Sequence, residues 1–108
     1  MRAYELMVIV DGDTDEPKAH SFVKTVSDGI VEAGGSVHGQ PDWWGKRPFA
    51  YPIDKKDAGY YLVVECLAEG GALDELERQL RLADEIVRHK LIRLPDAEAE
   101  RRGMAVSA

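Results

Sequence analysis

The sequence predicts an α+β domain in which a four-stranded antiparallel sheet carries two helices on one face, in the chain order β-α-β-β-α-β. Three observations support this prediction. Residues 2–10 and 60–68 have the apolar, β-branched composition of central strands. Two other segments repeat their apolar residues at helical spacing. The chain has 108 residues, of which 44% are hydrophobic, and this is enough for one domain with its own core.

The first strand and the first helix are predicted from residues 2–35. Both faces of the strand are largely apolar, which is typical of a central position in a sheet. An acidic turn leads into a helix that Asp13 or Thr14 can cap, with Pro17 tolerated in its first turn. A glycine pair at 34–35 ends the helix. The apolar residues at helical spacing are Phe22, Val23, Val26, Ile30 and Val31.

The middle of the chain is predicted to form a hairpin. Residues 36–53 have the composition of a long, irregular strand, and their glycine and prolines restrict it to an edge of the sheet. Residues 55–59 are expected to turn the chain into the second central strand. The residues that impose the irregularity are Gly39, Pro41 and Pro48.

The last third of the chain supplies the second helix and the fourth strand. A glycine pair at 70–71 precedes a helix with a leucine stripe, and residues 86–94 form a strand that Pro95 ends. We expect residues 1–95 to be the domain, and residues 96–108, which are small and charged, to be a mobile C-terminal tail. The element order is that of ferredoxin-like domains, in which the sheet face opposite the helices is open.

Composition limits the classes of function. The net charge is −6, which argues against a protein that grips nucleic acid by overall charge, although most of the cations lie in the second half of the chain. The single cysteine, Cys66, lies in an apolar segment and is interpreted as a small buried hydrophobe. No apolar run has the length of a signal-peptide core or a membrane span, so we expect a cytoplasmic protein.

Catalytic and metal sites lack the residues that they need. The acidic turn at 11–16 begins like a calcium loop but has Glu16 and Phe22 where glycine and glutamate are required. The histidines are scattered over three elements, without metal-ligand spacing. Glu5 and Glu65 can share the open sheet face, where solvated or salt-bridged carboxylates are far commoner than catalytic pairs. We therefore expect no enzymatic activity, no metal and no cofactor.

Residues 44–61 indicate a binding function instead. This expected hairpin brings cations and aromatic side chains closer together than any other stretch of the chain. A second basic cluster lies on the last strand, which this fold pairs with the first, bringing Arg88 or Lys90 towards Arg2. Edge-strand lysines that prevent aggregation are the plainer alternative for the hairpin. The candidate RNA-binding residues are Arg2, Lys46, Arg47, Lys55, Lys56, Arg88 and Lys90.

The open sheet face is expected to pack against a protein. Residues 59–64 faintly resemble an aromatic RNA-binding strand, but the first strand has no aromatic residue on its open face, so base stacking across the sheet is disfavoured. Exposed apolar surface is instead typical of a protein interface. The candidate partner residues are Met7, Ile9, Trp44, Tyr61 and Val63.

These motifs together resemble the bacterial small-subunit ribosomal protein six family. The resemblance covers about residues 1–95, in the right order, and the hairpin motif is its most specific part. Pro48 and Phe49 stand where the family often has a basic residue and leucine, which reduces the local charge by one. The motifs are Met1-Arg2-x-Tyr4-Glu5, Trp44-Gly45-Lys46-Arg47-Pro48-Phe49-Ala50-Tyr51-Pro52-Ile53, Gly59-Tyr60-Tyr61, Leu76-Glu77 with Leu80-Arg81, and Val87-Arg88-His89.

The resemblance implies a ferredoxin-like protein without enzymatic activity that is a structural component of the small ribosomal subunit in the cytoplasm. It also implies binding to the central domain of small-subunit rRNA as a heterodimer with ribosomal protein eighteen, a small basic protein. A cationic companion agrees with the net charge, because an acidic chain neutralises few phosphates by itself. The resemblance implies no membrane and no small-molecule substrate.

Two other classes of function remain open on the residues alone. A small ferredoxin-like enzyme would use a cleft near His38 or His89, and it would need a convergent polar or metal-binding set that the sequence lacks. A regulatory module that binds a small molecule has only the glycine pairs at 34–35 and 70–71 in its favour. Both pairs are explained more simply as helix boundaries.

Overall fold

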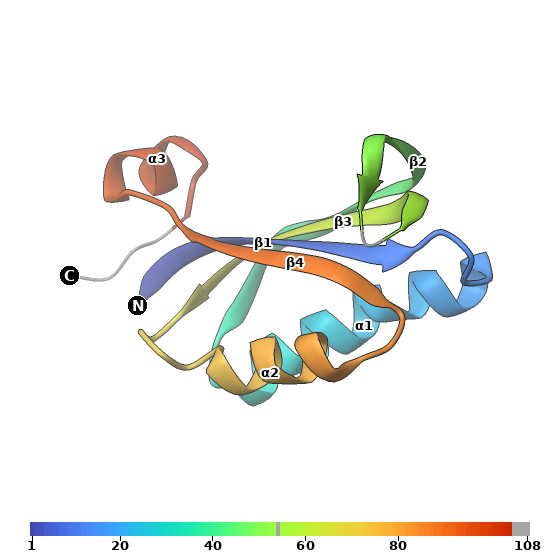
Figure 1. The fold of residues 1–108 in the computed structure, drawn as a ribbon. Helices are drawn as coiled ribbons and strands as arrows, with labels where there is room; N and C mark the ends of the chain where they lie inside the picture. Colours follow the sequence, from blue (N-terminus) through green and yellow to red (C-terminus); the bar gives the residue numbers. More distant parts are fainter. Residues whose placement is uncertain (54, 105–108) are drawn as a thin grey trace.

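A computed structural model describes residues 1–53 and 55–104, and in this part of the chain it contains four strands and three helices. The strands form one antiparallel sheet in the order β2-β3-β1-β4, with β1 and β3 in the centre (Figure 1). This confirms the predicted fold class and both predicted central strands. The elements are β1 (Arg2–Asp11), α1 (Glu16–Glu32), β2 (Ser36–Ile53), β3 (Lys56–Ala68), α2 (Asp74–Leu82), β4 (Ile86–Arg93) and α3 (Asp96–Arg101).

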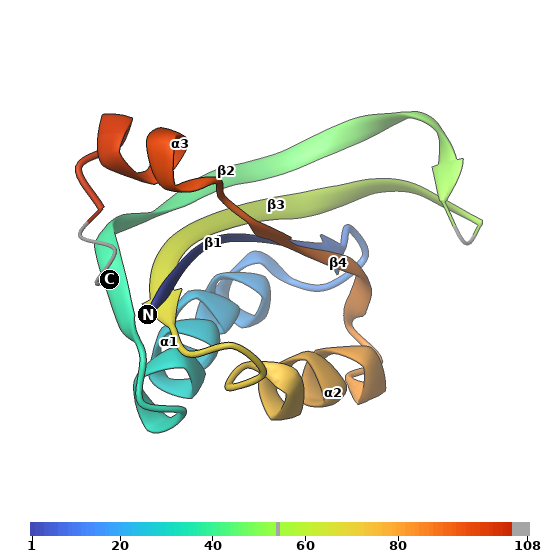
Figure 2. The ribbon, with the colours of Figure 1, turned by 90° about the vertical axis from the view of Figure 1, so that its left-hand side faces the viewer.

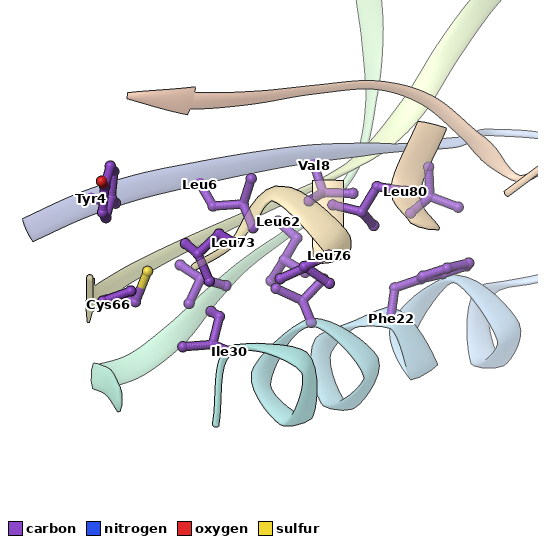
Figure 3. Close-up of a cluster of buried hydrophobic side chains, with 14 of the residues drawn as sticks. Tyr4, Leu6, Val8, Phe22, Ile30, Leu62, Cys66, Leu73, Leu76 and Leu80 are labelled. Carbon is purple, nitrogen blue, oxygen red and sulfur yellow. The ribbon is translucent and has the colours of Figure 1, made fainter. Parts of the chain in front are cut away.

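The core lies between the sheet and the helices α1 and α2, which cover one of its faces (Figure 3). Leu6 and Leu62 point into it from the two central strands and are 1% and 0% exposed. Ile30 of α1 and Leu76 of α2 meet them from the other side. Removal of each such side chain from water contributes roughly 1.5–3 kcal/mol, so this layer supplies most of the stability of the fold.

The start of α1 differs by one residue from the sequence prediction. Asp15, and not Asp13 or Thr14, is the N-cap, and its side chain accepts a hydrogen bond from the backbone N–H of Lys18 at 3.3 Å. The backbone of Asp15 is extended, which aims its carboxylate at the free N–H groups of the first turn. Pro17 lies in that first turn, as predicted.

The hairpin of β2 and β3 is longer than the sequence predicts. Residues 55–59, expected as a turn, mostly continue the ladder, since Pro48 lies opposite Ala58 and Ile53 opposite Lys56. The hairpin projects beyond the rest of the sheet (Figure 2) and contributes to an elongated molecule of 43 × 25 × 21 Å. The hydrogen bonds of an extended ladder outweigh the local preference of this glycine-containing segment for a turn.

The C-terminal segment, which the sequence predicts to be a mobile tail, folds back on the sheet. Residues 96–104 form α3 and a following turn on the face opposite α1 and α2 (Figure 1). Ala99 and Met104 are 0% and 2% exposed and pack against Ala3 of β1. Apolar side chains on both sides of this contact leave water, which favours a docked helix. Residues 105–108, the end of the predicted tail, lie outside the described residues.

Candidate binding surface on the open sheet face

Antiparallel pairing arranges the open face in rows of neighbouring side chains. Met7 of β1 lies opposite Val63 of β3 and Lys90 of β4. The next row places Tyr61 and Arg88 on either side of β1. Side chains of directly opposed residues project from the same face of a sheet. Two predicted RNA-binding cations and three predicted partner residues therefore share one surface, which we call the open-face surface.

Ile9 lies between Tyr61 and Arg88 in the register but is not part of the exposed surface, because it is 3% exposed. A Cβ atom on Gly59 would lie 2.7 Å from Ile9 Cγ2 and 2.9 Å from Phe49 Cζ. The Ile9 and Phe49 side chains therefore meet above Gly59, where the β2–β3 hairpin curls over the sheet. The expectation that Ile9 contacts a partner is corrected: Ile9 supports the surface from within.

The two adjacent tryptophans point to opposite faces of the sheet. Trp44 is 43% exposed on the open face and stacks on Tyr61, with ring centroids 5.6 Å apart. The Arg47 guanidinium carbon lies 5.8 Å from the centroid of the Trp44 ring. Trp43 packs against the core. The register shifts between Trp43 and Gly45, whose φ of 79° favours glycine, so a β-bulge lies beside the two rings.

The hairpin lysines line a cavity of about 260 Å³ at the end of β1. Lys56 Nζ lies 3.1 Å from Asp11 Oδ2 and 3.6 Å from Asp13 Oδ2. The Asp11 carboxylate raises the pKa of Lys56, and the Asp13 backbone N–H, followed by Lys56, lowers the pKa of Asp11. Lys46 and Lys55 line the same cavity. The charge of Lys56 is therefore offset by its own chain, which leaves it less available to phosphate than the other candidates.

Arg2 lies at the other end of β1 from the cations of the open-face surface. The β1–β4 register places Arg93 opposite Tyr4, near Arg2. Arg88 pairs seven positions along β1 from Arg2, which at the usual strand rise is about 23 Å. The expectation that Arg88 or Lys90 approaches Arg2 is therefore wrong, because antiparallel pairing brings the end of β4 to the start of β1.

The structure adds a charged site under α3 that sequence reasoning missed. Glu5 and Glu65 lie directly opposite each other on β1 and β3. Arg102 Nη1 lies 3.0 Å from Glu65 Oε2 and 3.7 Å from Glu5 Oε2. Arg102 Nε donates to Glu98 Oε1 at 2.8 Å, and the Glu98 and Glu65 carboxylates raise the pKa of Arg102. The sequence indicated that the two sheet glutamates can be salt-bridged, but their cation lies in the predicted tail.

A cavity of about 330 Å³ opens beside these carboxylates and reaches the ring of Trp44. The Trp44 Nε1–H group donates a hydrogen bond of 2.8 Å to Asp42 Oδ2. Carboxylates outnumber cations in the lining, so this end of the open-face surface is negative, whereas the end near Arg88 is positive. The lining residues are Glu5, Gln40, Asp42, Trp44, Val63, Glu65 and Arg102.

The remaining reactive side chains are held in structural contacts. Burial raises the pKa of the Cys66 thiol to about 11, so the thiol is protonated at neutral pH. His20 lies edge-on to Trp43, and His89 Nε2 lies 2.9 Å from Glu77 Oε2. Within residues 1–53 and 55–104, no three His, Cys, Asp or Glu side chains are placed to hold a metal ion. No helix of the same residues has the length and hydropathy to cross a membrane.

The class that the fold and the site define is a ferredoxin-like domain that carries cations, stacked aromatics and carboxylates on its open sheet face. Comparison with known proteins identifies the family. The family model for ribosomal protein S6 matches residues 3–93. The chain is 46% identical over 93 residues to the small ribosomal subunit protein bS6 of Salinispora arenicola, covering 86% of this chain and 96% of that protein.

Further matches agree. The chain is 38% identical over 96 residues to the bS6 protein of Alkaliphilus metalliredigens, covering 89% of this chain and 100% of that protein. The crystal structure of 30S ribosomal protein S6 from Thermotoga maritima matches with a TM-score of 0.85 and 33% identity, covering 94% of this chain and 95% of that one.

The chain belongs to the ribosomal protein S6 family. Membership confirms the family that the hairpin motifs indicated. It also confirms the expected class, a structural and non-enzymatic component of the small ribosomal subunit, together with the expected location at the cytoplasmic ribosome.

Proposed function

We propose that this chain binds the central domain of small-subunit rRNA together with ribosomal protein eighteen, as one half of a heterodimer. The observation that carries the proposal is the row formed by Val63, Met7 and Lys90, in which a cation stands directly beside apolar side chains. Such a surface suits two partners at once, because apolar side chains pack against protein and cations at the rim reach phosphate.

The apolar strip of the open-face surface is proposed to receive protein eighteen. Trp44 and Tyr61 form a rigid anchor, since their rings are stacked 5.6 Å apart, and rigid aromatic side chains lose little entropy on binding. Met7 and Val63 continue the strip and are partly exposed. Ile9 is assigned to the support of this strip, because its burial removes it from contact.

The proposed RNA contacts lie around this strip. Arg88 and Lys90 border it on β4 and are exposed, and Arg47 lies beside Trp44 on the hairpin. Arg2 and Lys56 stay in the proposal as separate points of contact, the first at the far end of β1 and the second already paired with Asp11. The full proposed set is Arg2, Lys46, Arg47, Lys55, Lys56, Arg88 and Lys90.

A basic companion follows from the charge of this chain. With a net charge of −6, the chain repels a polyphosphate except at its local patches. A heterodimer with a small basic protein adds the missing cations at the same surface, and the affinity for RNA then depends on both chains. We therefore expect the isolated chain to bind RNA far more weakly than the pair.

The test is binding of the full chain to a central-domain rRNA fragment, with and without purified protein eighteen, over a range of salt concentrations. The pair should bind the fragment far more tightly than the chain alone. Replacing both Arg88 and Lys90 with alanine removes two proposed phosphate contacts. The slope of log K against log salt should then become shallower by about 1.5, at roughly 0.7–0.9 per phosphate contact.

The matched control replaces two cations on the helix side, Lys24 and Arg78, which are exposed and face away from the open-face surface. This variant loses the same charge but should keep the wild-type salt slope. An equal change of slope in both variants would show that only net charge matters, and it would refute the proposed contacts. A chain that binds the fragment equally well without protein eighteen would refute the heterodimer.

A further inference from the structure

Two carboxylates lie opposite each other on the central strands, and neither is paired with a lysine or an arginine of a neighbouring strand. Glu5 lies opposite Glu65, and the residues that flank this pair across the described sheet are Ile92 on β4 and His38 on β2. Like charges placed directly opposite each other destabilise a sheet. A cation supplied from above the sheet is therefore needed to make this pair favourable.

Arg102 supplies that cation from α3, at the solvent edge. Its side chain is 32% exposed, and those of Glu5 and Glu65 are 31% and 32% exposed. Arg102 Nε is also paired with Glu98 of its own helix at 2.8 Å. A guanidinium that leaves Glu65 thus keeps a charged partner in Glu98. Ala99 and Met104 are buried independently of this ion pair and hold α3 in place.

The site carries more negative charge than Arg102 offsets. Asp42 lines the same cavity of about 330 Å³, and the Trp44 indole orients its carboxylate with a 2.8 Å hydrogen bond. Three carboxylates and one guanidinium therefore line the same open cavity. Two opposed carboxylates suit the planar, forked donor set of arginine better than the compact ammonium of lysine.

We propose that Glu5, Glu65 and Asp42 form a receptor for an arginine side chain of a basic protein segment, and that Arg102 occupies this receptor in the free chain. The incoming arginine replaces Arg102 on Glu65, while Arg102 remains with Glu98. Because Arg102 occupies the receptor, the apparent affinity for the segment is the intrinsic affinity multiplied by the fraction of chains in which Arg102 has left it, as for any tethered competitor. The inference rests on the proposed function in taking the open-face surface as the protein interface.

The test uses the full chain and a synthetic probe, an acetylated and amidated hexapeptide of alternating glycine and arginine, titrated at low salt. The Trp44 indole N–H resonance reports binding, because this group is hydrogen-bonded to Asp42. The same peptide with citrulline in place of arginine has the shape without the charge and should not bind. Arg102→Ala should tighten arginine-peptide binding by about fivefold, the effect of removing a competing ion pair that is partly exposed to solvent.

The control is Arg101→Ala, which removes an exposed arginine of the same helix that pairs with Glu98 and should leave peptide affinity unchanged. Asp42→Asn should weaken binding by threefold or more without touching a contact of α3. Equal binding of the citrulline peptide, an unchanged or lower affinity of Arg102→Ala, or an unchanged affinity of Asp42→Asn would each overturn the receptor.

The peptide experiment and the rRNA experiment can each refute one proposal without refuting the other. If the arginine peptide behaves as stated and protein eighteen does not bind, the proposed heterodimer is refuted and the receptor stands. If protein eighteen binds and the arginine peptide shows no preference over citrulline, the receptor is refuted and the heterodimer stands.

Discussion

Trp44 and Tyr61 lie stacked on the open sheet face, with their ring centroids 5.6 Å apart and their planes 11° apart. The neighbouring pair, Trp43 and Tyr60, is stacked in the same way towards the helices, with centroids 5.6 Å apart and planes 18° apart. Two consecutive tryptophans thus serve two different purposes. The inner pair belongs to the core, and the outer pair shapes the surface.

Replacement of the two tryptophans should separate these purposes. Trp43→Ala leaves a cavity beside the core and should lower the free energy of unfolding by about 3 kcal/mol. Trp44→Ala removes a surface stack and should cost about 1 kcal/mol. Urea unfolding followed by circular dichroism measures both. A Trp44 variant as unstable as the Trp43 variant would show that the outer ring is a structural element and not an available surface.

Gly59 should be intolerant of any side chain. A Cβ atom there would lie 2.7 Å from Ile9 Cγ2, 2.9 Å from Phe49 Cζ and 2.9 Å from the Val10 carbonyl oxygen. Since the backbone oxygen cannot move freely, Gly59→Ala should lower the free energy of unfolding by about 1–3 kcal/mol. Thermal unfolding of the purified variant checks this.

The control for this prediction is Gly70→Ala. Its Cβ would meet only the flexible end of the Arg2 side chain, at 2.6 Å from Nη1, and this end can turn away. The change in stability should stay within about 0.5 kcal/mol. An equal loss of stability in the two variants would mean that the close contacts above Gly59 are not the reason for its intolerance of a side chain.

The ion pair between Glu98 and Arg102 at the end of α3 should weaken in acid. The Arg102 guanidinium lowers the pKa of Glu98 below its usual value. A carboxyl group with a lowered folded-state pKa contributes stability above its unfolded pKa, and this contribution is lost as the pH falls through the folded value. The change should therefore begin only below about pH 4 and be absent near neutrality.

The Arg102 Nε–H resonance, recorded between pH 7 and pH 3, reports this ion pair because Arg102 Nε donates to Glu98 Oε1 at 2.8 Å. Glu98→Gln removes the titrating group, so the variant should show a much smaller change over the same range. A titration of wild-type size in this variant would assign the effect to another carboxyl group.

Cys66 should react with thiol reagents only through unfolding. Burial raises the pKa of its thiol to about 11, and the side chain is 0% exposed. Because the folded-state pKa is raised, the protonated thiol contributes stability below the unfolded pKa of about 8.5, and this contribution is lost progressively as the pH rises to the folded-state pKa of about 11. At pH 8 we expect modification to be about 10³-fold slower, or more, in the native chain than in urea. Rapid native modification at pH 8 would contradict the burial of this thiol.

Local pattern was sufficient for the architecture. The two-sided apolar character of residues 2–10 and 60–68 predicted central strands, and β1 and β3 are the central strands. Prolines and glycines predicted that the strand from residue 36 lies at an edge, as β2 does. These predictions succeed because burial on one or two faces leaves a periodic signature in the sequence.

The site was only partly predictable. The hairpin cations and aromatic residues were recognised by their density, and Arg88 and Lys90 by their strand. The burial of Ile9 under Phe49 was not recognised, since it follows from the curl of a hairpin. The docking of α3 was missed as well, because a short helix of small and charged residues has no strong periodic signal.

The sequence by itself determined the order of the four strands and the first two helices, the central strands and the family, because each of these is written in local spacing and in contiguous motifs. Only the tertiary structure decided that Trp43 faces the core and Trp44 the open face, and that Arg102 meets the glutamates opposed on β1 and β3. Both depend on strand register and on contacts between residues far apart in the chain. A shift of one residue in register exchanges the faces of a strand, and no local pattern reports it.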